Sequence, residues 1–278
     1  MKNSKFSIIV PCYNSEKYIG ITLQSVIQQD FANYEIICVD DGSTDETLNK
    51  IKYWKSKFNG KLKIIAKRHR GVSRARNIGL RRASGEYIVF LDSDDKMEKR
   101  LLYSLNEVIE KSNPDCIIGG FKCEAEEGIR LLSCEDIKKD KIIDRSQEEV
   151  FEYLFQQRFI MAVWRFVIRS EIVKRNKILF NEGVIHEDEE WLTKILLYCK
   201  SFQCIDIPFI TYIKRKNSIT TNPTNFNYIS KLEIAKNLLK FSESFVGYKK
   251  IHILRKTYRL CKEIYYTLME QAGDKNSP

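Results

Sequence analysis

The first hundred residues alternate between short apolar runs and stretches in which apolar residues recur every three or four positions. Four apolar runs rich in β-branched side chains predict strands, at residues 6–10, 35–39, 62–66 and 86–91. The stretches between them predict helices, as the spacing of Ile19, Leu23 and Ile27 illustrates. Strands joined by helices of this length form parallel sheets through right-handed crossovers. The pattern therefore predicts an α/β fold with a mostly parallel sheet flanked by helices.

Beyond residue 100 the pattern becomes more helical. It predicts a helix at 101–109, a strand at 116–121 and a helix at 146–159. The polar stretch 122–144 fits either a flexible loop or a small β insert. Two capping boxes, Ser43 with Glu46 and Ser146 with Glu149, predict the starts of the helices that follow them.

The last fifty residues predict two amphipathic helices. One face of the first carries Ile234, Leu238, Phe241 and Phe245. The second carries a near-heptad apolar face, made of Leu254, Tyr258, Cys261, Tyr265 and Leu268. On the opposite side of the second helix lie His252, Arg255, Arg259 and Lys262. We expect a body at residues 1–220 and a basic helical C-terminal region at 221–278.

The positive charge is concentrated in that C-terminal region. Residues 214–278 hold 13 Lys and Arg against 5 Asp and Glu, while the net charge of the whole chain is +10. The region can pack as a helical cap with a solvated basic side, rest on an anionic membrane surface, or do both. The nearly neutral body, with its acidic clusters, argues against a nucleic-acid partner despite a pI near 9.1.

Length and composition describe an ordinary globular chain, with 278 residues of which 43% are hydrophobic and 30% charged. The eight cysteines include no Cys-x-x-Cys pair, so we expect reduced thiols and a cytoplasmic location. No signal peptide is visible, and no apolar run approaches the roughly 18 residues of a membrane span. Contact with the inner face of the cell membrane would then be peripheral, through the C-terminal region.

Polar residues gather where each of the four predicted strands ends. They are Pro11, Tyr13 and Asn14 after the first strand, Asp40 and Asp41 after the second, 69–71 after the third, and 92–95 after the fourth. Carboxyl ends of parallel strands share one edge of a sheet, and ligands bind in the crevice there. An Asp40 or Asp41 carboxylate could accept hydrogen bonds from a nucleobase, with Tyr13 as its aromatic face. Capping of the next helix is the alternative for the two aspartates.

Two further clusters carry charge to the predicted crevice. Residues 67–82 hold seven Lys and Arg and no acid. Arg70, Arg74 and Arg76 stand at a helix start, where the dipole disfavours cations, so an anionic partner such as a diphosphate or nearby carboxylates is indicated. Asp92-Ser93-Asp94-Asp95 has the D-x-D spacing that suits Mg²⁺ or Mn²⁺ completed by phosphate oxygens, with helix capping as the alternative.

A second acidic cluster at 186–190 supplies a candidate general base, although acids also stabilise a first helical turn. The cluster is not a zinc-protease motif, because no second His follows at the required spacing. The chain contains no G-x-x-x-x-G-K-[ST] loop, no G-x-G-x-x-G and no G-x-S-x-G. P-loop, dinucleotide-binding and esterase-type functions therefore lose support.

Taken in order, these motifs resemble glycosyltransferase family 2 over about residues 5–220. The matching runs are Ile8 to Asn14, Val39 to Asp45, Gly71 to Asn77, Gly85 to Tyr87, Asp92 to Asp95, and Glu187-Asp188. The resemblance implies a GT-A fold, a nucleoside-diphosphate sugar donor, a Mn²⁺ or Mg²⁺ ion, and a bacterial enzyme that inverts the anomeric carbon. The expected activity is transfer of a hexose, from a UDP-sugar, to a glycan or lipid-linked acceptor of a surface polysaccharide.

The resemblance also implies roles for individual residues. Around the donor it places Pro11, Tyr13, Glu16, Asp40, Asp92 and Arg215. Asp41, Arg70, Arg76 and Ser93 complete the expected donor site, from their places at the strand ends and the helix start. Asp94 would bind the metal with Asp92 beside it, and Asp188 matches the catalytic base. Phe166 departs from the pattern, because many relatives carry a Lys at that place after Trp164. The competing interpretations are a nucleotidyltransferase that makes nucleotide sugars, which leaves Asp188 without a role, and a basic nucleic-acid binding protein.

Overall fold

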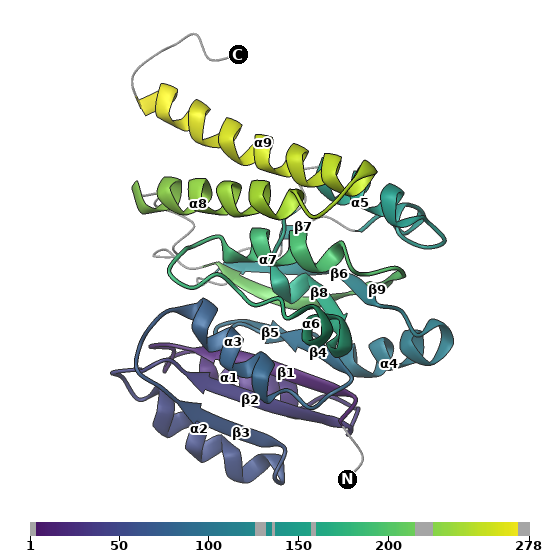
Figure 1. Cartoon of the computed structure of the whole chain (residues 1–278). Coiled ribbons are helices and arrows are strands. Elements are labelled where there is room, and N and C mark those ends of the chain that lie inside the picture. The colour runs from purple at the N-terminus through teal and green to yellow at the C-terminus, as the bar shows by residue number, and fades with distance from the viewer. Residues whose placement is uncertain (1–3, 126–131, 135–136, 157–159, 215–224, 272–278) are drawn as a thin grey trace.

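The computed structural model describes residues 4–125, 132–134, 137–156, 160–214 and 225–271 (Figure 1). The described strands form one nine-stranded sheet in the order β3-β2-β1-β4-β8-β6-β9-β5, with β7 paired to β6. Their bounds are β1 Phe6–Cys12, β2 Tyr34–Asp40, β3 Leu62–Ala66, β4 Tyr87–Phe90, β5 Lys96–Met97, β6 Cys116–Ala125, β7 Leu132–Cys134, β8 Phe166–Arg169 and β9 Phe202–Lys214.

Helices cover the sheet and extend beyond it. Their bounds are α1 Ile19–Ile27, α2 Thr47–Lys55, α3 Val72–Arg82, α4 Leu101–Ser112, α5 Gln147–Gln156, α6 Ser170–Asn176, α7 Glu187–Leu196, α8 Asn225–Ser242 and α9 Gly247–Gln271. Short 3₁₀ turns lie at Ser56–Phe58, Lys139–Lys141 and Val163–Arg165. The predicted α/β class, with helices on a largely parallel first half of the sheet, is confirmed.

The first four predicted strands are parallel and end at the same edge of the sheet. β1 pairs in parallel with β2 and with β4, and β2 pairs in parallel with β3. The register sets Cys12 opposite Asp40, and Asp40 opposite Ala66. β1, β2 and β4 are buried along their whole length, as continuous apolar runs predict for a sheet covered on both faces. The segments that follow these strands are therefore neighbours.

The two faces of the sheet build two hydrophobic cores. Ile9, Ile37 and Phe90 belong to the core shared with α3, α5 and α7. Ile8, Ile36 and Val89 belong to the core shared with α1, α2 and α4. The alternation follows from the two-residue period of a strand.

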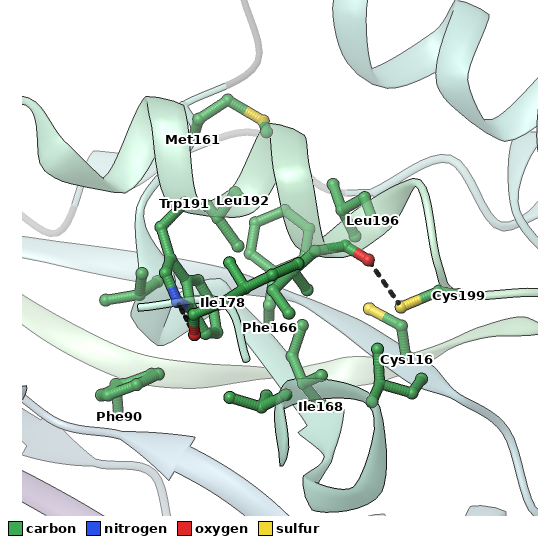
Figure 2. Close-up of a cluster of buried hydrophobic side chains, with 14 of the residues drawn as sticks. Phe90, Cys116, Met161, Phe166, Ile168, Ile178, Trp191, Leu192, Leu196 and Cys199 are labelled. Carbon is green, nitrogen blue, oxygen red and sulfur yellow. Dashed lines mark hydrogen bonds between the residues drawn. The ribbon is translucent and has the colours of Figure 1, made fainter. Parts of the chain in front are cut away.

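An aromatic group in the first core fixes the start of α7. The Trp191 ring stacks on Phe180 with centroids 4.6 Å apart, and Phe90 meets Trp191 edge-on at 5.5 Å. The Trp191 indole N–H donates to the Ile178 carbonyl at 3.4 Å. Figure 2 shows Trp191 and Leu192 reaching from α7 toward Phe166 and Ile168 of β8. This packing matters for function because Trp191 lies one helical turn after Asp188.

The two capping boxes have different outcomes. Ser146 and Glu149 exchange hydrogen bonds at the start of α5, as predicted. The prediction for Ser43 and Glu46 is wrong, because α2 begins only at Thr47. The backbone N–H of Thr47 is taken by Asp45 at 3.0 Å and that of Glu46 by Glu16 at 3.0 Å. A side chain from the preceding loop thus replaces the local box.

In the stretch 122–144, the described residues favour a β insert. β6 continues to Ala125 and pairs antiparallel with β7, as Phe121 opposite Cys134 illustrates. Residues 126–131 and 135–136 lie outside the described part of the chain.

The C-terminal helices α8 and α9 form a hairpin along one side of the body (Figure 1). Ile234 and Leu238 of α8 are buried, as predicted, together with Ile253 and Leu260 of α9. The near-heptad face of α9 does not pack on the body: Leu254, Tyr258, Cys261, Tyr265 and Leu268 are all exposed. Of the alternatives for this region, a cap packed through that face is therefore ruled out. The buried face instead includes His252 and Lys256.

The buried face of α9 also carries the apolar residues Ile253, Leu260 and Ile264, and it finds polar partners on the body. The Lys256 ammonium donates to the Glu189 carboxylate of α7, and His252 packs edge-on against Phe151 of α5. The division at residue 220 lies in 215–224, outside the described residues, and stays a prediction. No helix in the described ranges is both long and apolar enough to cross a membrane.

Candidate active site

The carboxyl edge of β1–β4 gathers the polar residues that the sequence singled out. Asp41 follows β2, and its carboxylate accepts hydrogen bonds from the backbone N–H of Arg70 at 3.0 Å and of Gly71 at 2.7 Å. His69 Nδ1 lies 2.8 Å from the same carboxylate. Asp41 therefore holds the loop after β3 in place.

Gly42 is required at this point because its φ of +76° is unfavourable for other residues, and a Cβ there would lie 2.7 Å from the His69 backbone nitrogen.

An aromatic platform stands above this loop. The Tyr13 ring stacks on His69, with centroids 3.9 Å apart and planes 19° from parallel. Tyr13 remains 44% exposed, so a flat ligand can still reach it. Pro11, one of the other residues expected at the base, is buried in β1 opposite Val39.

Several buried polar atoms at this edge have no hydrogen-bond partner among the described residues. They are Ser15 Oγ, Asp40 Oδ1, Ser73 Oγ, Arg74 Nη1 and Arg76 Nε. The other Asp40 oxygen accepts a hydrogen bond from Ser43 N at 3.4 Å. Buried polar atoms are normally satisfied, so a group of unsatisfied donors and acceptors indicates a place for a polar ligand.

Arg76 of α3 joins the two acidic clusters. Its guanidinium lies 3.0 Å from Asp92 after β4, and 2.5 and 2.7 Å from Glu187 and Asp188 in the first turn of α7. The Arg76 side chain is only 5% exposed, and its guanidinium carbon lies 5.5 Å from the centre of the Phe180 ring. Burial lowers the pKa of Arg76, but the three carboxylates outweigh it and the net pKa is raised. Arg76 stays charged.

Asp188 has the electrostatic surroundings of a proton acceptor. Burial raises its pKa to about 8, against the lowering by Arg76, and the neighbouring Glu187 and Asp92 charges also raise it. One oxygen faces Arg76, and the other accepts a hydrogen bond from the Val163 backbone N–H at 3.1 Å. Its side chain is 18% exposed, so a ligand can reach it.

Within the cluster after β4 the carboxylates differ. Asp95 is buried, and its carboxylate accepts a hydrogen bond from the Ile213 backbone N–H at 3.1 Å, which ties the cluster to β9. Ser93 is also buried, and its carbonyl accepts a hydrogen bond from the Thr22 hydroxyl at 2.9 Å. Asp92 and Asp94 are the partly exposed members. They are the oxygen donors that a hard divalent cation would find here.

The described residues contain no group of three His, Cys, Asp or Glu side chains that could enclose a metal ion. Two carboxylates of D-x-D spacing fit a cation that takes the rest of its ligands from phosphate and water.

The remaining predicted residues are spread around this edge or lie outside the description. Glu16 binds the start of α2, and the Arg70 side chain is exposed. Arg215 falls in a segment that the structure does not describe. Phe166, where relatives carry a Lys, is buried in β8. The roles assigned to these residues stay predictions.

Sequence reasoning gave no role to Glu187 or to the ring of His69. The position of Glu187 next to Asp188 could have indicated that it belongs to the site. The stacking of His69 on Tyr13 could not be predicted, because it depends on how two separate loops meet.

The sheet is mixed, and its first half is parallel. An acidic D-x-D turn follows β4, and a second carboxylate cluster lies on α7. Together these features define a GT-A glycosyltransferase. The model of the family "Glycosyl transferase family 2" matches residues 7–173. The chain belongs to this family.

Known proteins of this type are similar over much of the chain. The uncharacterized glycosyltransferase EpsJ of Bacillus subtilis is 29% identical over 219 residues, which are 78% of this chain and 63% of EpsJ. The cholesterol galactosyltransferase of Borreliella burgdorferi is 26% identical, over 94% of this chain and 76% of that protein.

A third relative is the poly(ribitol-phosphate) beta-N-acetylglucosaminyltransferase TarS of Staphylococcus aureus. It is 40% identical over 116 residues, 41% of this chain and 20% of TarS. The crystal structure of TarS 1–349 in complex with UDP-GlcNAc superposes with a TM-score of 0.73 at 25% identity, covering 92% of this chain and 72% of that one. The sequence matches thus cover less than two thirds of EpsJ and a fifth of TarS.

Proposed function

We propose that this protein is an inverting glycosyltransferase that moves a sugar from a UDP-sugar to a hydroxyl of a glycan or lipid-linked acceptor. The observation that carries the proposal is the meeting of Asp92 and Asp188 at the Arg76 guanidinium. It puts a carboxylate from the donor side and a candidate base on opposite flanks of one cation. Inverting displacement needs a base that acts on the face opposite the leaving group, and Asp188 comes from a different element than the donor-side carboxylate.

The donor would occupy the edge with the unsatisfied polar atoms. Asp40 Oδ1 is available to a nucleobase N–H, and Tyr13 offers an aromatic face. The TarS structure with UDP-GlcNAc supports a UDP-sugar as the donor class. Arg70, Arg74 and Arg215 are proposed to face the diphosphate.

Mn²⁺ or Mg²⁺ is proposed as the cofactor, held by Asp94 with Asp92 beside it. When bound, such an ion stabilises the negative charge that develops on the leaving diphosphate. Arg76 keeps Asp92 in place at 3.0 Å.

Asp188 would take the proton of the acceptor hydroxyl as its oxygen attacks the anomeric carbon. The bond between that carbon and the diphosphate oxygen breaks, and the nucleoside diphosphate leaves with the electron pair. The Val163 N–H and Arg76 fix the orientation of the Asp188 carboxylate. A pKa of about 8 gives it the basicity that the task needs near neutral pH.

The acceptor class follows from the relatives in part. TarS is named for poly(ribitol-phosphate), and the Borreliella protein for cholesterol. A hydroxyl of a surface polysaccharide or a lipid-linked glycan is our proposal for this chain. The cytoplasm is the proposed location, in keeping with the free thiols of the seven cysteines whose side chains the structure describes.

The test is a screen of nucleotide sugars with the full chain, with Mn²⁺ and with EDTA. A matching donor should raise the melting temperature and be hydrolysed slowly to the free nucleoside diphosphate, read by mass spectrometry. A parallel arm supplies nucleoside triphosphate and sugar 1-phosphate. Formation of nucleotide sugar in that arm, with no hydrolysis in the first, would replace the proposal by a nucleotidyltransferase.

A further inference from the structure

The α8–α9 hairpin exposes an unusual share of the large apolar side chains. Ten of the seventeen large hydrophobic residues exposed in the described part of the chain lie between Phe226 and Leu268. Val246, in the turn between the two helices, is 87% exposed. Contiguous exposed apolar surface on a globular protein marks a contact with something else.

On α9 the exposed residues form one regular stripe, which we call the α9 stripe. Its members follow one another at spacings of three and four residues: Ile251, Leu254, Tyr258, Cys261, Tyr265 and Leu268. This spacing sets all six on one side of the helix. The other side is occupied, because Ile253, Lys256 and Leu260 are buried against the body. The stripe therefore faces away from the protein.

The charges of α9 that border the α9 stripe are positive, although Glu152 of α5 lies 3.5 Å from the Arg255 guanidinium. Residues 247–262 contain six Lys and Arg and no Asp or Glu. Lys256 is buried, whereas Lys250, Arg255 and Lys262 are exposed. Arg255 lies four residues after Ile251 and Lys262 four after Tyr258, so both border the same side of the helix. The first acid along α9 is Glu263, which pairs with Lys231 of α8 at 2.9 Å.

This arrangement of apolar and basic residues distinguishes between two possible partners for the α9 stripe, a second copy of the chain and a lipid surface. In a helix pair with a second copy, the positions bordering the stripe face the equivalent positions of the other helix. Lys250, Arg255 and Lys262 would then face like charges, which opposes self-association. An anionic lipid surface satisfies both features, because the apolar side chains enter the headgroup boundary and the cations meet lipid phosphates.

The hairpin also lies next to the candidate active site. At the start of α8, the Ser230 hydroxyl accepts a hydrogen bond from the Ile185 backbone N–H at 3.2 Å. Asn227 lies 3.3 Å from the His186 ring nitrogen. His186 directly precedes Glu187 and Asp188 of α7. The start of the hairpin is therefore in contact with the residues that directly precede the candidate base, Asp188.

We propose that the outward face of the α8–α9 hairpin, centred on the α9 stripe, docks on an anionic phospholipid bilayer. The face supplies the apolar and cationic contacts of an interfacial helix without any membrane span. This docking concerns where the enzyme works and does not depend on the identity of its donor.

The test is flotation of the full chain with vesicles, which needs no turnover. Vesicles of phosphatidylcholine and phosphatidylglycerol should carry the protein, and vesicles of phosphatidylcholine alone should not. The triple variant L254Q/Y258Q/L268Q should lose flotation more than tenfold. The variant K250Q/K262Q should bind about twenty-five-fold more weakly, since each basic residue near such a surface contributes roughly a factor of five.

Matched controls lie on α2, at the opposite end of the molecule (Figure 1). Tyr53 is 63% exposed, and Lys52 and Lys55 are exposed beside it. Y53Q and K52Q/K55Q should float like the parent chain. Circular dichroism and donor hydrolysis establish that each variant is folded.

A second readout uses the exposed Cys261 thiol within the α9 stripe. Cys134, whose side chain lies outside the description, is replaced by Ser so that an environment-sensitive fluorophore is attached at Cys261. The emission of this fluorophore should shift to the blue when anionic vesicles are added. Unshifted emission, or equal flotation of the parent and the triple variant, would overturn the proposal. So would a dimer in light scattering that the triple variant converts to monomer, because the stripe would then belong to a second copy. Failure here leaves the proposed reaction unaffected.

Discussion

Arg76 of α3 and Asp188 of α7 lie 2.7 Å apart although 112 residues separate them in the sequence. The same guanidinium holds Asp92 at 3.0 Å. The candidate base is thus in an ion pair with a buried cation that also touches the donor-side carboxylate.

Asp188→Asn should remove transfer while leaving donor binding within about twofold of the parent. The amide keeps the shape and can still accept from the Val163 N–H, but it cannot take a proton at neutral pH. Turnover with acceptor should fall by a factor of about 10² to 10⁴. Donor affinity is measured by calorimetry, and turnover is measured from the nucleoside diphosphate that is released. Near-normal turnover in this variant would remove Asp188 from the role of base.

The pH dependence should follow the same carboxyl. Its pKa is raised to about 8 by burial, so the base form increases as pH rises toward 8. The value of kcat/KM should climb about tenfold per pH unit below that point and level off above it. A profile that is flat between pH 6 and about 8 would contradict the assignment.

Stability should depend on pH in the opposite sense. Because the folded protein binds this proton more tightly than the unfolded chain, whose pKa stays near 3.8, the Asp188 contribution to stability is present at low pH. It is lost progressively as pH rises from about 4 to about 8, and stays constant above that. Asp188→Asn should lose that part of the dependence, measured as the free energy of unfolding in urea at several pH values.

Asp94→Ala should abolish the effect of Mn²⁺ on UDP binding. Removing the carboxylate takes away the proposed cation ligand, so affinity with Mn²⁺ should drop to the level seen with EDTA. The control is Asp95→Ala, which should keep the response to Mn²⁺ but lower the melting temperature, because Ile213 N–H loses its acceptor. An undiminished response to Mn²⁺ in Asp94→Ala would disprove the metal site.

Asp40→Asn should weaken UDP binding roughly tenfold or more. The unsatisfied Asp40 Oδ1 is the acceptor proposed for the base, and the variant places an amide donor in one of two positions there. Asp30→Asn is the control, because Asp30 is exposed and pairs with Arg100 away from this edge. Equal affinities of the two variants, measured by calorimetry, would show that the nucleotide does not use Asp40.

Lys256→Met should destabilise the fold by about 2 kcal/mol. Lys256 is buried, and its ammonium is the partner of Glu189, whose side chain is 21% exposed, so the usual cost of breaking a buried pair is reduced. The double variant Lys256→Met/Glu189→Gln should recover most of the loss. Urea unfolding of the parent, both single variants and the double variant measures the coupling. Additive losses would show that the pair contributes nothing.

The sequence predicted the parallel half of the sheet and its polar edge well, and there is a physical reason. β1, β2 and β4 are buried on both faces, so their composition alone marks them as strands, and parallel pairing then places Asp40 and Asp92 at one edge. Long-range partners are different. From the sequence alone Lys256 is expected at the surface, but it is buried beside Glu189, on the same face of α9 as Ile253 and Leu260.

The start of α2 shows the same limit at shorter range. The local capping box of Ser43 and Glu46 is intact in the sequence, but Glu16 from the preceding loop takes the Glu46 N–H. The roles of Asp188 and Arg76 could be anticipated separately. Their ion pair depends on α3 and α7 meeting at Phe180 and Trp191, which no spacing along the chain encodes.

The shared core also limits how this protein can be recombined. Ile234, Leu238, Ile253 and Leu260 belong to the same buried cluster as Ile9 and Phe90, with α5 and α7 between them. The hairpin is therefore not a detachable unit. A chimera that takes its C-terminal helices from another enzyme must exchange α5 and α7 with them, so the natural crossover point lies near residue 147 rather than near residue 225.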